Sequence, residues 1–320
     1  MKSTTKIKVV GVGGSGGNAV SRMKKCKIEG VTLVAINADA QDLKKIRADL
    51  KIRIGKKLTR GLGTGMNPDI GRRAAEEQRE EIKEVLKGSD MVFVTYGCGG
   101  GTGTGAGPVV AEIAKNSGAL TVAVVTKPFF FEGQARSRVA ENGLRRLKEK
   151  VDSLIVISND KLLETLDPGI TILNAFWICD DVLREAVKGI SDLIMLPGIV
   201  NVDFANIKTI MKNSGTALFG IGRAFGEKRA EKAALQAINS PLLDINLRGA
   251  KGILFNVSGG KDISLSEIDE VAKVICQEIS PKAKIIFGAI LDEKPAFHRA
   301  CSGAGLKKGE IKVRVIATGF

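Results

Sequence analysis

Short apolar runs rich in β-branched residues alternate with helical patterns in the first half of the chain, and this alternation constrains the fold most. The runs that we predict as buried strands are IKVVGVG, VTLVAIN, MVFVTYG, LTVAVVTKPF and SLIVISND. Strands that alternate with helices form a parallel, doubly wound sheet. In such a sheet the loops at the carboxyl ends of the strands form the ligand site. The first half therefore predicts an α/β domain whose functional residues follow its strands.

A long helical pattern over residues 171–196 comes next. Beyond it, further strand patterns are separated by only two helical patterns, at 227–239 and 264–279, which is typical of an α+β domain. The 320 residues exceed the length of one ordinary domain. We therefore predict three parts: a first domain at 1–170, a central connecting helix at 171–198 and a smaller α+β domain at 199–320.

The chain carries 49 Lys and Arg residues against 35 Asp and Glu, a formal net charge of +14. Nucleic acid would be a natural partner, but one Trp, one Tyr and 4% aromatic residues leave little for base stacking. The basic residues are also interleaved with acids, as in RRAAEEQREEIKE. We therefore expect no nucleic-acid partner and attribute the charge to a solvated surface or to attraction toward an acidic partner.

No apolar run approaches the roughly 20 residues that cross a bilayer, so we expect no direct membrane insertion. The first residues lead into a strand without the core and cleavage site of a signal peptide, which predicts an intracellular protein. The single histidine, His298, lies in a segment, 293–309, that we predict as an exposed loop. The cysteines show no CxxC spacing, so we predict no metal ligands from the protein itself.

A first glycine loop follows the first strand, where Gly11, Gly13 and Gly16 satisfy GxGxxG before a helix. Asp39 comes after the second strand, ~20 residues on, where a ribose-binding acid of a dinucleotide site would lie. This loop alone leaves a dinucleotide-binding oxidoreductase open as an alternative.

A second glycine loop, GCGGGTGTGAGP, runs from Gly97 to Pro108 after the strand MVFVTYG. We predict that Pro108 opens the following helix. Glycine amides can approach phosphate oxygens without obstruction by a Cβ, the hydroxyls of Thr102 and Thr104 can donate, and the helix N-terminus adds its positive end. Because GxxxxGK[ST] occurs nowhere, the phosphates would be held largely by backbone, which excludes the P-loop NTPases.

The motif GGGTGTG resembles the signature of the tubulin-like GTPases, and nearly the whole chain resembles the FtsZ family of bacterial and plastid cell-division proteins. The segments that carry the resemblance include IKVVGVGGSGGNAVSRM, LTRGLGTGMNPDIGRRAAEE, VAVVTKPFFFEG, NVDFANIKTIMKNSG and VIATGF. The resemblance implies a Rossmann-like GTPase domain joined by a long central helix to a smaller α+β domain. It also implies a protein that polymerises head to tail into filaments of a division ring and hydrolyses GTP to GDP at the subunit interface. Mg²⁺ would bind through the phosphates, with K⁺ as a further candidate.

The resemblance assigns a phosphate-binding role to both glycine loops, at Gly13, Gly14, Ser15, Gly16, Gly17 and Asn18 and at Gly99, Gly100, Gly101, Thr102, Gly103, Thr104 and Gly105. Glu132 and Arg136 match positions that hold the ribose and phosphates. Phe176 would stack on guanine, and Asp181 would accept hydrogen bonds from its ring nitrogens.

The resemblance places the catalytic residues in a loop that enters the nucleotide site of the next subunit. The family pattern there is NxDFxD, and this chain carries Asn201, Asp203 and Asn206. An amide orients water but accepts no proton, so we expect slow hydrolysis, although Asp203 remains. The alternative is a slow or inactive GTPase that serves as a structural co-subunit of a division filament.

The resemblance also implies partners and a location. The main partner would be the chain itself, in a head-to-tail homopolymer, and the charge of +14 favours a more acidic paralogue as a second partner because the family is commonly acidic. The sequence stops at Phe320 without the linker and adaptor peptide usual in the family, so membrane adaptors are not readable. We expect a cytoplasmic protein at the division site, or a stromal one in a processed plastid form.

Overall fold

The computed structural model describes residues 5–26, 28, 30–164, 166, 169–196, 198–200, 202–240, 247–291, 306 and 308–320. Asn201, His298 and most of the predicted loop at 293–309 therefore lie outside the described residues. The chain divides into two compact units, Met1–Lys188 and Gly189–Phe320. Helix α8 (Ile172–Met195) forms where the central helix is predicted, and the division between the units falls inside it.

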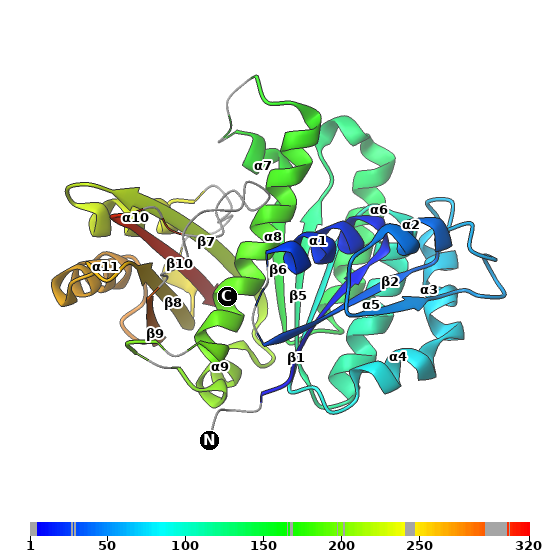
Figure 1. Cartoon of the computed structure of the whole chain (residues 1–320), viewed down its shortest axis with the longest axis horizontal. Helices are drawn as coiled ribbons and strands as arrows, with labels where there is room; N and C mark the ends of the chain where they lie inside the picture. Colours follow the sequence, from blue (N-terminus) through cyan, green and yellow to red (C-terminus); the bar gives the residue numbers. More distant parts are fainter. Residues whose placement is uncertain are drawn as a thin grey trace. The chain divides into compact units, whose positions relative to one another are not determined.

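The first unit contains a parallel sheet with strand order β3-β2-β1-β4-β5-β6, drawn from blue to green in Figure 1. Its strands are β1 (Ile7–Val12), β2 (Val31–Asn37), β3 (Leu50–Arg53), β4 (Met91–Gly97), β5 (Leu120–Lys127) and β6 (Ser153–Ser158). Its helices are α1 (Gly13–Lys25), α2 (Ala40–Lys45), α3 (Pro68–Glu77), α4 (Arg79–Leu86), α5 (Gly101–Asn116), the short η1 (Phe130–Glu132), α6 (Gln134–Lys148) and α7 (Asn159–Leu163), followed by α8. All five predicted strands form, and the α/β fold class is confirmed.

Alternating side chains of the strands supply both faces of this sheet. Val34 and Ile36 of β2 belong to a large buried cluster together with residues of α3, α4, α5 and α6. Ala35, between them, packs instead with Leu43 of α2 and with Ile46. Because successive strand residues point to opposite faces, helices cover both sides and the carboxyl ends of the strands are left for the loops.

Helix α5 begins earlier than Pro108 predicts, and that prediction is wrong. The helix starts at Gly101, so the glycine run is itself helical and Pro108 lies inside it. A Cβ on Gly105 would lie 2.0 Å from the carbonyl oxygen of Pro68, and one on Gly107 2.2 Å from the ring of Tyr96. Glycine is therefore required here by close packing of α3 and β4 against α5, in spite of its poor helix propensity.

The second unit contains four strands in the order β7-β10-β8-β9, with β10 antiparallel to β7 and β8, and β9 parallel to β8. Its elements are α9 (Phe204–Met211), β7 (Gly215–Phe225), α10 (Arg229–Ile238), η2 (Leu247–Gly249), β8 (Gly252–Gly259), α11 (Leu265–Gln277), β9 (Lys284–Leu291) and β10 (Glu310–Thr318). Helices α10 and α11 share one buried cluster with β7, β8 and β10. The α+β prediction holds, but α9 is an additional helix where the sequence predicts only a loop.

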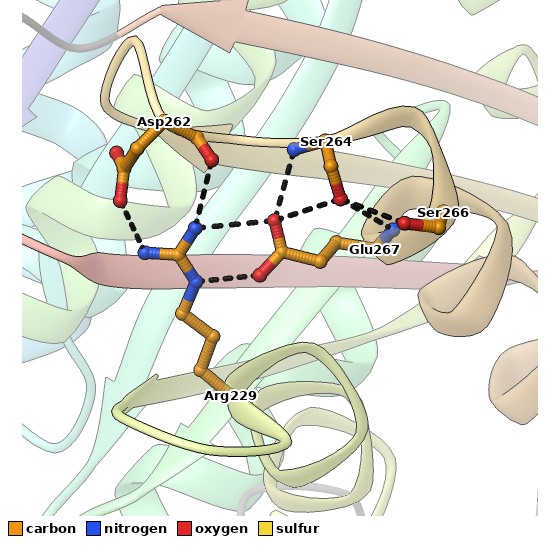
Figure 2. Close-up of polar contacts among 5 residues, drawn as sticks. All are labelled: Arg229, Asp262, Ser264, Ser266 and Glu267. Carbon is orange, nitrogen blue, oxygen red and sulfur yellow. Dashed lines mark hydrogen bonds and ion pairs between the residues drawn. The ribbon is translucent and has the colours of Figure 1, made fainter.

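Arg229 joins the start of α10 to the start of α11 (Figure 2). Its Nε lies 2.6 Å from Oε1 of Glu267, and its Nη1 lies 2.6 Å from Oδ2 of Asp262. Glu267 also closes a capping box with Ser264 at the N-terminus of α11. Hydrogen bonds from Arg229 lower the pKa of both carboxyls below their ordinary values of 3.8 and 4.5.

Arg229→Met is expected to lower the free energy of unfolding of the second unit by about 2 kcal/mol at pH 7, because Glu267 loses a charged partner. The acids have lowered pKa values in the folded state, so the contribution is present above pH 3.8–4.5 and is lost as the pH falls through the folded values. Urea unfolding at pH 7 and pH 3 measures this. Lys273→Met, which breaks the exposed Lys273–Asp269 pair, is the control and should change stability by less than about 0.5 kcal/mol. Equal effects of the two variants would contradict the assignment.

Candidate nucleotide-binding site

The first glycine loop is the junction of β1 and α1. Gly13 begins α1 with φ of +72°, a left-handed conformation that favours glycine. A Cβ on Gly16 would lie 2.4 Å from the carbonyl oxygen of Thr95, so only glycine lets α1 approach β4 this closely. Among the described residues, no side chain caps α1, and its first turn holds no acid. Its first backbone N–H groups are therefore directed out of the helix end without a side-chain acceptor.

The second glycine loop is the junction of β4 and α5. Gly100 is the N-cap residue of α5 and, within the described part of the chain, no side chain caps this helix either. A Cβ on Gly100 would meet nothing within 4 Å, whereas one on Gly99 would lie 2.7 Å from Cγ of Arg136. The backbone at Gly100 thus faces open space, as a phosphate-binding loop requires.

The two loops contact each other. A Cβ on Gly13 would lie 3.0 Å from the amide nitrogen of Gly103 and 3.3 Å from Cβ of Thr102, and one on Gly97 would lie 2.8 Å from Oγ of Ser15. Strands β1 and β4 are parallel neighbours, which brings both helix N-termini to one edge of the sheet. Two positive helix ends that meet in this way suit a chain of phosphates.

Two threonines of the second loop have different surroundings. Thr104 is buried, and its hydroxyl accepts a hydrogen bond from the amide of Gly99 at 2.9 Å. The hydroxyl of Thr102 lies 3.2 Å from that of Thr64. Thr104 therefore braces the loop, and Thr102 has the more accessible hydroxyl.

The segment that contains Thr64 is a part of the site that sequence reasoning missed. A Cβ on Gly101 would lie 2.3 Å from Oγ1 of Thr64, so this segment packs directly against the start of α5. A signal was present in the motif RGLGTGMN, because Gly61, Gly63 and Gly65 all adopt positive φ.

Glu132 and Arg136 form an ion pair beside the second loop, with Nη1 and Oε2 2.6 Å apart. The other oxygen of Glu132 accepts a hydrogen bond from the amide of Phe129 at 2.9 Å. A Cβ on Gly99 would lie 2.7 Å from Cγ of Arg136, so the side chain of Arg136 packs closely against the backbone of the second glycine loop. Nε of Arg136 is buried and has no hydrogen-bond partner among the described residues.

Phe176, near the amino end of α8, belongs to a cluster with two aromatic residues at η1. Phe176 lies edge-on to Phe129, with ring centroids 5.1 Å apart, and Phe129 stacks on Phe131 at 4.9 Å. Phe176 keeps 39% of its surface exposed, so one part of its ring remains available to a ligand. Asp181, further along α8, pairs with Arg184 at 2.8 Å.

Asp39 takes a structural role. It caps α2, where its side chain accepts from the amides of Gln41 and Asp42, each at 2.9 Å. The carboxyl needed for the ribose of a dinucleotide is thus engaged in helix capping, which weakens the oxidoreductase alternative.

Comparison with known families decides between these alternatives. The model of the Tubulin/FtsZ family GTPase domain matches residues 6–167, and that of the FtsZ family C-terminal domain matches residues 215–320. The chain belongs to the FtsZ family. It is a filament-forming, tubulin-like GTPase that binds guanine nucleotide. The family consists of division-site cytoskeletal proteins. The oxidoreductase alternative is not favoured.

Solved structures of FtsZ proteins agree. The chain is 50% identical to FtsZ from M. jannaschii in an empty dimer, with a TM-score of 0.91 over 98% of this chain and 88% of that one. A mutant of the same FtsZ matches with 50% identity and a TM-score of 0.92, over 98% and 91% of the two chains. CetZ2 from Haloferax volcanii, in a GTPγS-bound protofilament, is 18% identical, with a TM-score of 0.81 over 98% and 92%, and shares the fold. Within the described residues, no helix has both the length and the apolar character to cross a bilayer.

The residues expected to be catalytic in this FtsZ-family chain belong to the second unit. Asp203 is the N-cap of α9, and its Oδ1 accepts from the amide of Asn206 at 2.8 Å. Both side chains are exposed. Asp203 and Asn206 therefore lie together at one helix N-terminus, and Asn201 lies outside the described residues.

Asp180, next to Asp181 on α8, has an unusual environment. It is buried, with Nε of Arg22 from α1 3.3 Å away, and Arg22 also lies over the ring of Trp177. Burial raises the pKa of Asp180 to about 7, against the lowering effect of Arg22, and the neighbouring Asp181 raises it further.

Asp180→Asn is expected to change how stability depends on pH. Because the folded pKa of about 7 lies above the ordinary 3.8, the stability from protonated Asp180 is complete below pH 3.8 and lost as the pH rises through about 7. Relative to the wild type, the variant with the neutral amide should therefore gain about 4 kcal/mol of stability between pH 4 and pH 8. Urea unfolding of both proteins across this range measures the difference. Parallel stability curves would contradict the assignment.

Proposed function

We propose that GTP binds at the edge of the sheet where the two glycine loops meet, with its phosphates on the backbone of both. The observation that carries this proposal is the contact of Gly13 with Gly103 and Thr102 between two helix N-termini that have no side-chain cap among the described residues. The residues that we propose to hold the phosphates are Gly13, Gly14, Ser15, Gly16, Gly17, Asn18, Gly99, Gly100, Gly101, Thr102, Gly103, Thr104 and Gly105. Thr104 would act indirectly, by holding the loop.

The remainder of the nucleotide would extend toward α6 and α8. Glu132 and Arg136 would hold the ribose and phosphates, and the unpartnered Nε of Arg136 supports this role. Phe176 would stack on guanine with its exposed face, and Asp181 would accept from the base. Mg²⁺, with K⁺ as a second cation, would bind through the phosphate oxygens and neutralise charge on them.

We propose that hydrolysis is completed between subunits. The exposed carboxylate of Asp203 at the start of α9, with Asn201 and Asn206, would enter the nucleotide site of the next subunit and orient the attacking water. A head-to-tail contact of this kind does not close on itself and builds a filament. The proposed organisation keeps the division into residues 1–170, 171–198 and 199–320, with the last part supplying catalytic residues to a neighbour.

GTP hydrolysis against protein concentration, with light scattering in parallel, tests this proposal. Turnover and scattering should rise together above one threshold concentration. Turnover that is proportional to protein concentration from the lowest values, without scattering, would show that a single chain completes the site and would overturn the proposal.

Asn206→Asp is expected to raise GTP turnover roughly a hundredfold, the low end of the range for a proton-accepting group, since Asp203 already supplies one carboxylate. Position 206 lies in the first turn of α9, where an acid is favourable to the helix dipole, so stability should not fall. Ala205→Asp adds the same charge one residue earlier, at an exposed position, and should leave turnover unchanged.

Two outcomes separate the alternatives. If the wild-type chain forms filaments at background turnover and Asn206→Asp raises the turnover, the chain is a structural co-subunit. Unchanged turnover in Asn206→Asp would show that position 206 needs no carboxylate.

We further propose a cytoplasmic location at the division site, or the stroma for a processed plastid form. The chain itself would be the main partner. A more acidic paralogue fits the net charge of +14. Co-sedimentation of the chain with acidic and basic FtsZ proteins, at low and high salt, separates a charge-driven partner from homopolymerisation.

A further inference from the structure

Thr64 is the only buried residue in the segment 61–70. It is 6% exposed, whereas Leu62, two residues earlier, is 87% exposed. Gly63 and Gly65, on either side of Thr64, adopt φ of +79° and +54°, a left-handed conformation that glycine takes without strain. The segment therefore turns a single side chain into the protein, and that side chain carries a hydroxyl.

The hydroxyl of Thr64 meets that of Thr102 in the first turn of α5. The two oxygens lie 3.2 Å apart, and neither hydroxyl has another hydrogen-bond partner among the described residues. Thr102 also lies beside the first glycine loop, because a Cβ on Gly13 would be 3.3 Å from Cβ of Thr102. Thr102 therefore adjoins both the buried Thr64 and the place where the two glycine loops meet.

Burial decides which of the two hydroxyls donates. Each hydroxyl has one proton, so one of them donates to the other, and the second keeps its proton for a further acceptor. If Thr102 donated, the proton of the buried Thr64 would have no acceptor among the described residues, and an unsatisfied buried donor is costly. If Thr64 donates, only the proton of Thr102 remains, and Thr102 is partly exposed. The second arrangement is favoured, and it leaves Thr102 able to donate to a ligand.

The backbone around Thr64 fixes its position. A Cβ on Gly101 would lie 2.3 Å from Oγ1 of Thr64 and 2.7 Å from the amide nitrogen of Asn67. That amide donates to the carbonyl oxygen of Thr64 at 3.0 Å, and the side chain of Asn67 caps α3. Thr64 is therefore held between the starts of α3 and α5, where its hydroxyl stays within reach of Thr102.

We propose that Thr64 is a positioning residue for phosphate binding, because its buried hydroxyl donates to Oγ1 of Thr102 and so directs the O–H of Thr102 to a phosphate oxygen. This inference rests on the proposed role of Thr102 at the phosphates. A hydroxyl that accepts one hydrogen bond donates more strongly to another, since the two bonds polarise each other. A threonine that served packing alone would affect stability and would not act through Thr102.

Competition against a fluorescent nucleotide, in the full chain, measures the dissociation constant of GTP. Thr64→Val removes the hydroxyl and keeps the branched shape, and it is expected to raise the constant about fivefold, the value of one neutral hydrogen bond. Thr64→Ser keeps the hydroxyl and should stay within about twofold of the wild type. Thr121→Val is the matched control, because the buried hydroxyl of Thr121 donates to the carbonyl of Ala119 at the amino end of β5 and should leave the constant unchanged.

The same substitution in a Thr102→Ala background separates positioning from packing. Once the hydroxyl of Thr102 is absent, Thr64→Val should have no further effect on GTP affinity. Thr64→Ala, which adds no volume beside Gly101, takes the place of Thr64→Val if that variant does not fold.

Three results would contradict the proposal. Equal effects of Thr64→Val in both backgrounds would show that Thr64 acts by packing. An unchanged constant in Thr64→Val beside a raised one in Thr102→Ala would overturn the positioning role and leave the role of Thr102 standing. If Thr102→Ala itself binds GTP as tightly as the wild type, the hydroxyl of Thr102 does not contact a phosphate, and both ideas fail.

Discussion

Asp203→Asn is expected to lower GTP turnover by about 10²–10⁴-fold, the effect of removing a group that accepts or directs a proton. The substitution isolates this role, because Asn is as good an N-cap as Asp and can still accept from the amide of residue 206. Stability and filament formation should therefore be close to wild type. Turnover, light scattering and urea unfolding of the same preparations measure the three properties.

The control for that prediction is Asp203→Ala, which removes both the carboxylate and the cap of α9. It should lose the same turnover and also about 1 kcal/mol of stability. If Asp203→Asn hydrolyses GTP at the wild-type rate, the carboxylate of Asp203 is not part of the reaction, and its place at the start of α9 is structural only.

Gly105→Ala is expected to lower the free energy of unfolding of the first unit by about 3 kcal/mol or more, with or without nucleotide. The added Cβ would lie 2.0 Å from the carbonyl oxygen of Pro68 and 2.8 Å from the amide of Arg72, both of which are backbone atoms of α3 that cannot rotate away. Urea unfolding of the nucleotide-free protein measures this effect.

Gly100→Ala is the matched variant in the same loop, and it should behave in the opposite way. Its Cβ would meet nothing within 4 Å and its φ is −87°, which alanine adopts readily. Stability should change by less than about 0.5 kcal/mol, whereas GTP affinity should fall at least about tenfold if the open space belongs to a phosphate. Unchanged affinity in Gly100→Ala would show that phosphates do not approach this backbone.

Five strands of the first unit, β1, β2, β4, β5 and β6, could be predicted from the sequence because they are largely buried and read as continuous apolar runs. The edge strand β3 could not, since only Ile52 of its four residues is buried. The helix start at Gly101 could not, since helix propensity argues against GTGTGAG and the close approach of α3 that stabilises it is a tertiary contact. Helix α9 was missed for a related reason: its eight residues, Phe204–Met211, are too few for a clear period.

The candidate site shows the same division between local and tertiary information. The glycine loops could be found from the sequence because so many glycines follow two strands within a few residues, although close packing, as at Gly16 and Gly105, accounts for part of them. The ion pair between Arg184 and Asp181 on α8 could not be foreseen, since acidic and basic residues at such spacings on a helix usually form a solvated surface. Only the burial of Arg184 changes that interpretation.

Among the described residues no side chain caps α1 or α5, so a nucleotide bound where we propose would be a structural part of the first unit. The side chain of a Ser, Thr, Asp or Asn commonly accepts hydrogen bonds from the first N–H groups of a helix. Here the acceptor for two helix N-termini would instead be the phosphates of the ligand. Binding of GTP would then raise the free energy of unfolding of the first unit, by about 2.7 kcal/mol at a GTP concentration a hundred times the dissociation constant. Release of the nucleotide would leave both helix N-termini without an acceptor at the same time. The presence or absence of nucleotide would then change the stability of α1 and α5 as well as that of the loops.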